Sequence, residues 1–296
     1  MGKTIFTGAG VAIVTPFAKD GSVNYDALGN LIERQIENET DAIIICGTTG
    51  EASTLTDDEQ IETIRFTVDK VNKRVPVVAG AGSNDTRHGM ELCKRCEQVG
   101  ADALLIVTPY YNKTTQKGLV KYYEDMSGAA DLPVIMYSVP SRTGLNIAPA
   151  TVETIAKNVE NVVAIKEASG NIAQVAEIAA RTQGDIDIYS GNDDQIVPLL
   201  SLGGKGVISV LSNVAPKYTH DMVMSFLNGD TKKAAKMQID AIDLIKALFI
   251  ETSPIPVKVA LNMMGLDAGG YRAPLVDMDE KNVPVLKKAL KDFGLI

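Results

Sequence analysis

The sequence of 296 residues has no excess of positive charge and no long hydrophobic run. Its 29 Lys and Arg residues are outnumbered by 37 Asp and Glu residues, which gives a net charge of −8 at pH 7. A surface of this sign attracts neither nucleic acid nor anionic lipid, so we expect neither as a partner. The longest apolar runs, such as Ala103–Val107, fall far short of the ~20 residues that a membrane-spanning helix needs.

Cysteine and histidine are also scarce. Three cysteines give no disulfide framework in a chain of this size, and the N-terminal residues lack a secretory pattern, so we expect a cytoplasmic protein. Both histidines, His88 and His220, fall in helical patterns, which argues against a histidine metal site or a Ser-His-Asp triad. Cys93 and Cys96 lie inside a helical pattern over Thr86–Val99 without a second pair, so we expect them to pack a helix.

Short runs rich in Val and Ile recur along the chain and alternate with amphipathic stretches. These runs are continuously apolar, as expected of parallel strands that are buried on both faces. Thr56 and Glu59 form a capping box ahead of one of the amphipathic stretches. The eight predicted strands are Val11–Val14, Ala42–Cys46, Val75–Ala79, Ala103–Val107, Val134–Tyr137, Val162–Ile165, Ile186–Tyr189 and Gly206–Val210.

This alternation predicts an α/β protein with a (β/α)8 TIM barrel, and a doubly wound open sheet is the alternative. After the last strand the pattern is purely helical, and a helix over Pro216–Leu227 would complete the barrel. Three more helices, Thr231–Phe249, Pro256–Met264 and Asn282–Phe293, would form a C-terminal three-helix appendage. We therefore expect a catalytic barrel over residues 1–230 and a helical domain over residues 231–296.

Reactive groups in such barrels lie at the C-terminal ends of the strands. Lys166 directly follows a predicted strand, and exclusion from water favours the neutral amine that forms a Schiff base. The alternative is an ordinary ion pair, for instance with Glu167. Tyr137 ends the preceding strand and could transfer protons at Lys166, although a tyrosine there is more often a packing residue.

Two further strand ends offer groups that could bind a carboxylate. Thr48 and Thr49 lie between two glycines, so their hydroxyls and backbone N–H groups could approach a ligand, or the segment could be a plain turn. Arg142 lies in a predicted loop and could clamp a carboxylate, although a solvated arginine is the simpler interpretation. The glycines at 203, 204 and 206 precede a strand, so they lie at the wrong end of the barrel for a phosphate site.

Five segments along the chain together form a recognisable pattern: Gly47–Glu51, Thr108–Asn112, Tyr137–Gly144, Lys166–Gly170 and Pro254–Lys258. In these segments the chain resembles the dihydrodipicolinate synthase family, and the resemblance covers nearly its whole length. This family belongs to the pyruvate-dependent class I aldolases, which include N-acetylneuraminate lyase. The resemblance implies condensation of pyruvate with L-aspartate 4-semialdehyde to 4-hydroxy-tetrahydrodipicolinate, the first committed step of the diaminopimelate route to L-lysine.

The resemblance also assigns roles to individual residues. It implies that Lys166 forms an imine with pyruvate, and that Tyr137, Thr49 and Tyr111 form a proton relay. The residues that it implies for substrate binding are Thr48, Thr49, Arg142, Gly191 and Ile208. No metal or organic cofactor is implied, because the lysine activates the carbonyl group. Tyr111 would cross a tight dimer interface into a neighbouring site, within a homotetramer built as a dimer of dimers.

One region departs from the pattern of family members that L-lysine inhibits. Two histidines of that pattern are replaced by Asp57 and Gln60, and a glutamate is replaced by His88, whereas Asn84 and Tyr110 are retained. We therefore expect no inhibition by L-lysine.

Two other functions stay open at this point. A retro-aldol lyase acting on a sugar acid would share the lysine and the tyrosine, but it would not need Arg142. A barrel that only binds a small acid or a phosphorylated ligand would need no strand-end lysine facing a tyrosine.

Overall fold

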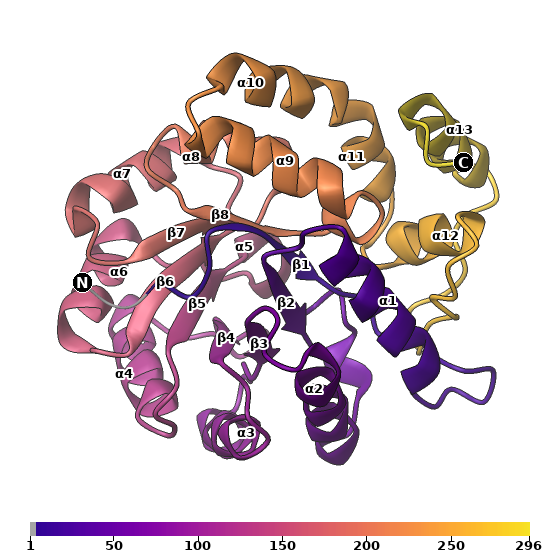
Figure 1. Cartoon of the computed structure of the whole chain (residues 1–296). Coiled ribbons are helices and arrows are strands. Elements are labelled where there is room, and N and C mark those ends of the chain that lie inside the picture. The colour runs from indigo at the N-terminus through magenta and orange to yellow at the C-terminus, as the bar shows by residue number, and fades with distance from the viewer. Residues whose placement is uncertain (1–3) are drawn as a thin grey trace.

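The computed structural model describes residues 4–296, and residues 1–3, with which the expected barrel domain begins, lie outside the described residues. Eight parallel strands form a closed ring surrounded by helices (Figure 1). Each strand pairs with the next one along the chain, and β8 pairs with β1, which confirms the barrel and excludes an open sheet. The strands are β1 (Gly8–Ala12), β2 (Ala42–Ile45), β3 (Val77–Gly80), β4 (Ala103–Val107), β5 (Val134–Ser138), β6 (Val162–Glu167), β7 (Asp187–Ser190) and β8 (Gly206–Ser209).

The helices that follow the strands pack on the outside of the ring (Figure 1). The α-helices up to the end of the barrel are α1 (Tyr25–Glu37), α2 (Asp57–Val71), α3 (Thr86–Gln98), α4 (Gln116–Ser127), α5 (Pro140–Thr143), α6 (Pro149–Asn158), α7 (Ile172–Thr182), α8 (Ile196–Leu200) and α9 (Pro216–Leu227). Three short 3-10 helices, η1 (Ala52–Thr54), η2 (Asp193–Gln195) and η3 (Leu211–Asn213), follow β2, β7 and β8.

The first strand is the one whose predicted position differs most from the structure. β1 begins three residues before the predicted Val11, because it includes Gly8 and Gly10, which give no apolar signal. Gly8 pairs with Gly206 where the ring closes. A Cβ atom at Gly206 would lie 1.9 Å from the carbonyl oxygen of Gly8, so this close approach requires glycine.

Two local predictions are confirmed by the helices. The capping box at the start of α2 is complete, because the Thr56 hydroxyl accepts from the Glu59 N–H and the Glu59 carboxylate accepts from the Thr56 N–H. Cys93 and Cys96 are buried in α3, where exclusion from water raises the pKa of each thiol to about 12. Both cysteines therefore pack the helix against the barrel, as expected.

The C-terminal segment contains α10 (Thr231–Asp240), α11 (Ile242–Leu248), α12 (Ile255–Met263) and α13 (Val283–Phe293). The single helix predicted over Thr231–Phe249 is thus divided at Ala241, because α10 packs on α9 whereas α11 packs on α13 (Figure 1). A domain boundary after residue 230 stays a prediction. Over residues 4–296, no helix is both long and apolar enough to cross a membrane.

Buried apolar side chains form two layers. One layer fills the inside of the ring and includes Ile44, Leu105, Tyr189 and Ile208. The other lies between the strands and the surrounding helices. Because successive residues of a strand face these two layers alternately, every position of most strands is apolar.

Candidate active site

Lys166 and Tyr137 lie side by side on neighbouring strands. They are directly paired in the register of β5 and β6, so their side chains lie on the same face of the sheet. The Nζ atom of Lys166 lies 4.2 Å from the centre of the Tyr137 ring. Both residues are only 6% exposed. The structure therefore places an amine and a phenol together at the C-terminal ends of the strands, where both are largely inaccessible to solvent.

Glu167, the alternative partner of Lys166, faces the other way. One carboxylate oxygen accepts from the backbone N–H of Ser169 at 2.7 Å, and the other accepts from the side-chain amide of Gln174 at 3.0 Å. Burial raises the pKa of this carboxyl group. The interpretation of Lys166 as the partner of Glu167 is therefore wrong, because adjacent residues of a strand point to opposite faces.

Gly191 follows β7 and leaves space beside Lys166. A Cβ atom at this position would lie 2.6 Å from the Cβ atom of Ala168 and 3.2 Å from the Cε atom of Lys166. The Gly191 N–H donates to the Glu167 carbonyl at 2.7 Å, so the backbone is held in place. Any side chain at position 191 would press on the lysine.

The two threonines lie in the loop that joins β2 to η1. Thr49 is buried and Thr48 is exposed, and both line the same cavity as Lys166. The Thr15 hydroxyl donates to the carbonyl of Gly50 at 2.7 Å, which ties this loop to the end of β1. The loop thus presents two hydroxyl groups that could hold a carboxylate.

Arg142 lies in the single helical turn α5, not in the irregular loop that the sequence suggested. Its Nη2 atom donates to the carbonyl of Ser253 at 3.1 Å, and the side chain lines the same cavity as Lys166. Four further N–H donors remain on a planar guanidinium that makes one such bond. Arg142 is therefore held at the cavity mouth with donors free for a carboxylate.

These residues surround one cavity of about 430 Å³. Seven of the eight predicted site residues line it: Thr48, Thr49, Tyr137, Arg142, Lys166, Gly191 and Ile208. The eighth, Tyr111, lies outside it, has a left-handed φ of 69° and is 92% exposed. Within this chain, the structure does not bring Tyr111 to the other site residues.

The cavity also has lining residues that the sequence analysis missed. Asp193 is buried, and one of its oxygens accepts from the N–H groups of Val210 and Leu211 at 3.0 and 2.8 Å. Burial raises the pKa of this carboxyl group. Its position shortly after β7 could have drawn attention to it, because polar site residues follow strand ends. Helix α11 contributes Ile242, Ile245 and Lys246 to the cavity, and Phe249 follows directly after the helix. No sequence pattern indicated that these residues line the cavity.

A second cavity of about 570 Å³ adjoins the first and shares Thr48, Tyr137, Val139 and Arg142 with it. All the residues that the resemblance assigned to an inhibitor pocket line it: Asp57, Gln60, Asn84, His88 and Tyr110. His88 Nε2 lies 3.0 Å from a carboxylate oxygen of Asp57, and the Gln60 amide donates to the Gly80 carbonyl at 2.8 Å. Asp57, Gln60 and His88 therefore already contact other groups of the protein.

The family model of the dihydrodipicolinate synthetase family matches residues 5–293. The chain belongs to this family. The 4-hydroxy-tetrahydrodipicolinate synthase of Acetivibrio thermocellus is 60% identical over 296 residues, which is 100% of both chains. Family membership confirms the prediction of a lyase of the class I aldolase type and sets aside a barrel that only binds a ligand.

Solved structures of the family have the same fold. The dihydrodipicolinate synthase of Thermotoga maritima is 43% identical and superposes with a TM-score of 0.97, covering 99% of this chain and 100% of that one. A chloride-inhibited dihydrodipicolinate synthase of Acinetobacter baumannii, complexed with pyruvate, is 42% identical with a TM-score of 0.96 and the same coverage.

Proposed function

We propose that Lys166 carries out the family reaction in this chain, the condensation of pyruvate with L-aspartate 4-semialdehyde to 4-hydroxy-tetrahydrodipicolinate. The observation that supports this assignment most strongly is the position of the lysine. Its amine lies 4.2 Å from the Tyr137 ring, in a cavity that also contains two threonines and an arginine. A nucleophilic amine, a proton-transfer group and two carboxylate-binding groups are the parts that this condensation needs.

The first half of the reaction uses pyruvate. The neutral amine of Lys166 attacks the ketone carbon, and loss of water gives an imine. The protonated imine draws electrons, so the methyl group loses a proton and an enamine forms. Thr48 and Thr49 bind the pyruvate carboxylate, and the apolar side chain of Ile208 lines the same cavity.

The second half uses the semialdehyde. The enamine carbon attacks the aldehyde and forms the new carbon–carbon bond, and the aldehyde oxygen takes up a proton. The amino group of the semialdehyde then attacks the imine carbon, closes the ring and releases Lys166 as a free amine. Arg142 binds the carboxylate of this substrate, with Gly191 near its other end. The overall reaction releases one water molecule, and it needs no metal or organic cofactor because the imine activates the carbonyl group.

Tyr137 transfers protons at the imine, with Thr49 and Tyr111 as the other members of the relay. Tyr111 is exposed and does not line its own cavity, so we assign it to the site of a second copy of the chain. This arrangement requires a dimer, and we propose that two dimers associate into a tetramer.

We also place the reaction in the cytoplasm, where the free cysteines 46, 93 and 96 stay reduced.

Trapping of the imine tests the role of Lys166. The protein is incubated with pyruvate, reduced with borohydride and digested, and the modified peptide is identified by mass spectrometry. We expect one reduced pyruvate per chain, attached to Lys166, and no such adduct in Lys166→Met. An adduct on Lys258 or Lys205 with Lys166 unmodified would overturn the assignment.

Mixing two inactive variants tests whether Tyr111 acts in a second copy. A dimer of one Lys166→Ala chain and one Tyr111→Phe chain contains one site with both wild-type residues only if Tyr111 crosses the interface. Random exchange of subunits should then restore about a quarter of the wild-type activity, because half of the dimers are mixed and each has one working site. No gain over the separate variants would show that Tyr111 acts in its own chain or not at all.

A further inference from the structure

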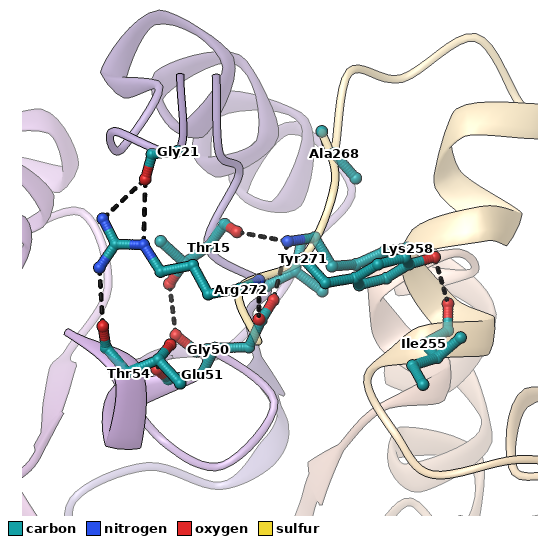
Figure 2. Close-up of polar contacts among 12 residues, drawn as sticks. Thr15, Gly21, Gly50, Glu51, Thr54, Ile255, Lys258, Ala268, Tyr271 and Arg272 are labelled. Atoms are coloured by element: carbon teal, nitrogen blue, oxygen red, sulfur yellow. Dashed lines mark hydrogen bonds and ion pairs between the residues drawn. The ribbon is translucent and has the colours of Figure 1, made fainter. Parts of the chain in front are cut away.

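A second lysine, Lys258 on α12, is fully buried but lies outside the cavity that Lys166 lines. Its Nζ atom donates to a carboxylate oxygen of Glu51 at 2.8 Å and to the carbonyl of Thr15 at 2.9 Å (Figure 2). The same nitrogen lies 4.5 Å from the centre of the Phe17 ring. Burial lowers the pKa of this amine, and the charge of Glu51 opposes that effect. The amine of Lys258 is thus bonded to groups of the protein, whereas Lys166 lines the cavity.

Glu51 is the last residue of the loop that carries Thr48 and Thr49. Its φ of 54° lies in the left-handed region, which a residue with a side chain occupies only when its surroundings hold it there. Its N–H donates to the Thr48 carbonyl at 3.1 Å, so its backbone is bonded directly to the carboxylate-binding part of the loop. The conformation of the loop therefore depends on what holds Glu51.

Both carboxylate oxygens of Glu51 are held by the C-terminal part of the chain. One accepts from Lys258, and the other accepts from the backbone N–H of Arg272 at 3.2 Å. The Arg272 side chain extends the attachment, since its Nη1 atom donates to the carbonyl of Thr54 at 2.7 Å (Figure 2). The segment from α12 to Arg272 thus forms hydrogen bonds with the loop at Glu51 and with η1 at Thr54.

We propose that Lys258 and Glu51 are positioning residues that hold the Thr48–Thr49 loop in the conformation that binds the pyruvate carboxylate. The proposal rests on the proposed function of that loop. A buried ion pair gives little net stability, because the cost of removing both charges from water offsets their attraction. It does fix geometry, because each buried charge must stay opposite the other. Removal of either charge would release the left-handed Glu51 and change where the two hydroxyl groups point.

The test measures how the trapping of pyruvate on Lys166 depends on pyruvate concentration. In Lys258→Met, we expect the concentration for half-maximal labelling to rise at least about tenfold, since small misplacements of binding groups have large effects. Glu51→Gln, which keeps the size of the side chain, should behave in the same way. The double variant should be no worse than the worse single variant, because both residues act through one contact. The KM for the semialdehyde should change less than about twofold, because the bond of Arg142 goes to the Ser253 carbonyl and not to Lys258 or Glu51.

Leu286→Ala serves as the matched control, because Leu286 is fully buried in the same C-terminal region, in α13, which packs on α11 and α12. It should lower the melting temperature and leave the half-maximal pyruvate concentration unchanged. Wild-type dependence on pyruvate in folded Lys258→Met or Glu51→Gln would overturn the proposal, as would an equal rise in Leu286→Ala. If Lys258→Met does not fold, the pyruvate dependence of labelling in Glu51→Gln tests the proposal by itself. Failure to label Lys166 in the wild-type protein would instead refute the proposed function.

Discussion

Lys166 and Tyr137 face each other across neighbouring strands, and the amine nitrogen of the lysine lies 4.2 Å from the centre of the tyrosine ring. The contact joins the reactive amine to the group that we assign to proton transfer. The nitrogen lies over the face of the ring, so the contact also orients the free lysine side chain. Conversion of the amine to an imine changes the charge and shape of the group that Tyr137 contacts.

Tyr137→Phe should keep the ring contact and lose the proton-transfer group. We expect kcat to fall by about 10²–10⁴-fold, which is the usual contribution of general acid–base catalysis. Labelling of Lys166 by pyruvate and borohydride should still occur, but more slowly. Tyr123→Phe is the control, because it removes a buried hydroxyl that donates to the Ile106 carbonyl in the outer layer. A kcat of Tyr137→Phe within a few-fold of that of the control would show that the hydroxyl is not catalytic.

Arg142→Ala should affect one substrate only. Loss of a charged contact costs about 1.5–3 kcal/mol, so the KM for the semialdehyde should rise by roughly ten- to a hundredfold. The pyruvate dependence of labelling on Lys166 should stay within about twofold of wild type, because Thr48 and Thr49, not Arg142, are assigned to the pyruvate carboxylate. Steady-state kinetics with each substrate varied in turn measure both effects. Equal increases for both substrates would indicate that Arg142 is structural, acting through its bond to the Ser253 carbonyl.

Gly191→Ala should reduce activity strongly. The new methyl group would lie 2.6 Å from the Cβ atom of Ala168 and 3.2 Å from the Cε atom of Lys166, so the lysine would have to move. The rate of labelling on Lys166 should fall at least about tenfold, because reaction depends on placement to within about 1 Å. Gly270→Ala is the control, because a Cβ atom there would meet no atom within 4 Å. If both variants label at the wild-type rate, the space beside Lys166 is not required.

Millimolar L-lysine should leave the activity nearly unchanged. The ligand carries two ammonium groups, and the position that supplies a glutamate in inhibited family members is His88, which already contacts Asp57 at 3.0 Å. Loss of one charged contact lowers affinity by roughly ten- to a hundredfold. A coupled assay across a lysine titration measures the effect. Half-inhibition below about 1 mM, a binding free energy near −4 kcal/mol, would contradict the prediction.

A charge-exchanged variant makes the lysine prediction sharper. Asp57→His combined with His88→Glu keeps an acidic and a basic group facing each other but moves the carboxylate to α3. The double variant should gain sensitivity to L-lysine relative to wild type. The two single variants are its controls, since each places two like groups together. Equal responses in wild type and the double variant would show that other residues of the second cavity decide lysine binding.

The stability of the protein should depend on Glu59 in a defined pH range. The bonds from Arg272 lower the pKa of Glu59 from 4.5 to about 2. Because the pKa is lower in the folded state, the stabilisation is present above pH 4.5 and is lost as the pH falls through 2. Glu59→Gln keeps the capping geometry and should be about 1 kcal/mol less stable at pH 7, since solvent screens this partly exposed pair.

Urea denaturation of both proteins at several pH values measures that difference. The difference in the free energy of unfolding between wild type and Glu59→Gln should decrease steadily from pH 5 to the lowest pH at which the protein stays folded, as expected from linkage. A gap that stays constant over this range would mean that the charge of Glu59 does not contribute and that only its hydrogen bonds matter.

The sequence by itself determined a parallel sheet and the centre of its site, and the pairing of β8 with β1 decided that the sheet closes into a barrel. Eight continuously apolar runs that alternate with amphipathic stretches predict parallel strands covered on both faces, and the carboxyl ends of such strands meet at one edge. Lys166 directly follows its run, Tyr137 ends the neighbouring run, and Thr48 and Thr49 lie two and three residues after another, so all four were expected at that edge. Local patterns such as the Thr56–Glu59 capping box depend on neighbouring residues, and these were also predicted.

Only the tertiary structure decided which distant segments complete the site. Glu51 and Lys258 are 207 positions apart, and no periodic pattern links them. The same is true of the bond from Arg142 to Ser253 and of the residues that α11 adds to the cavity. The glycine pair that closes β1 on β8 gave no apolar signal, because its role is to bring two backbones close together. Such contacts depend on the folded path of the whole chain, which local composition and periodicity do not encode.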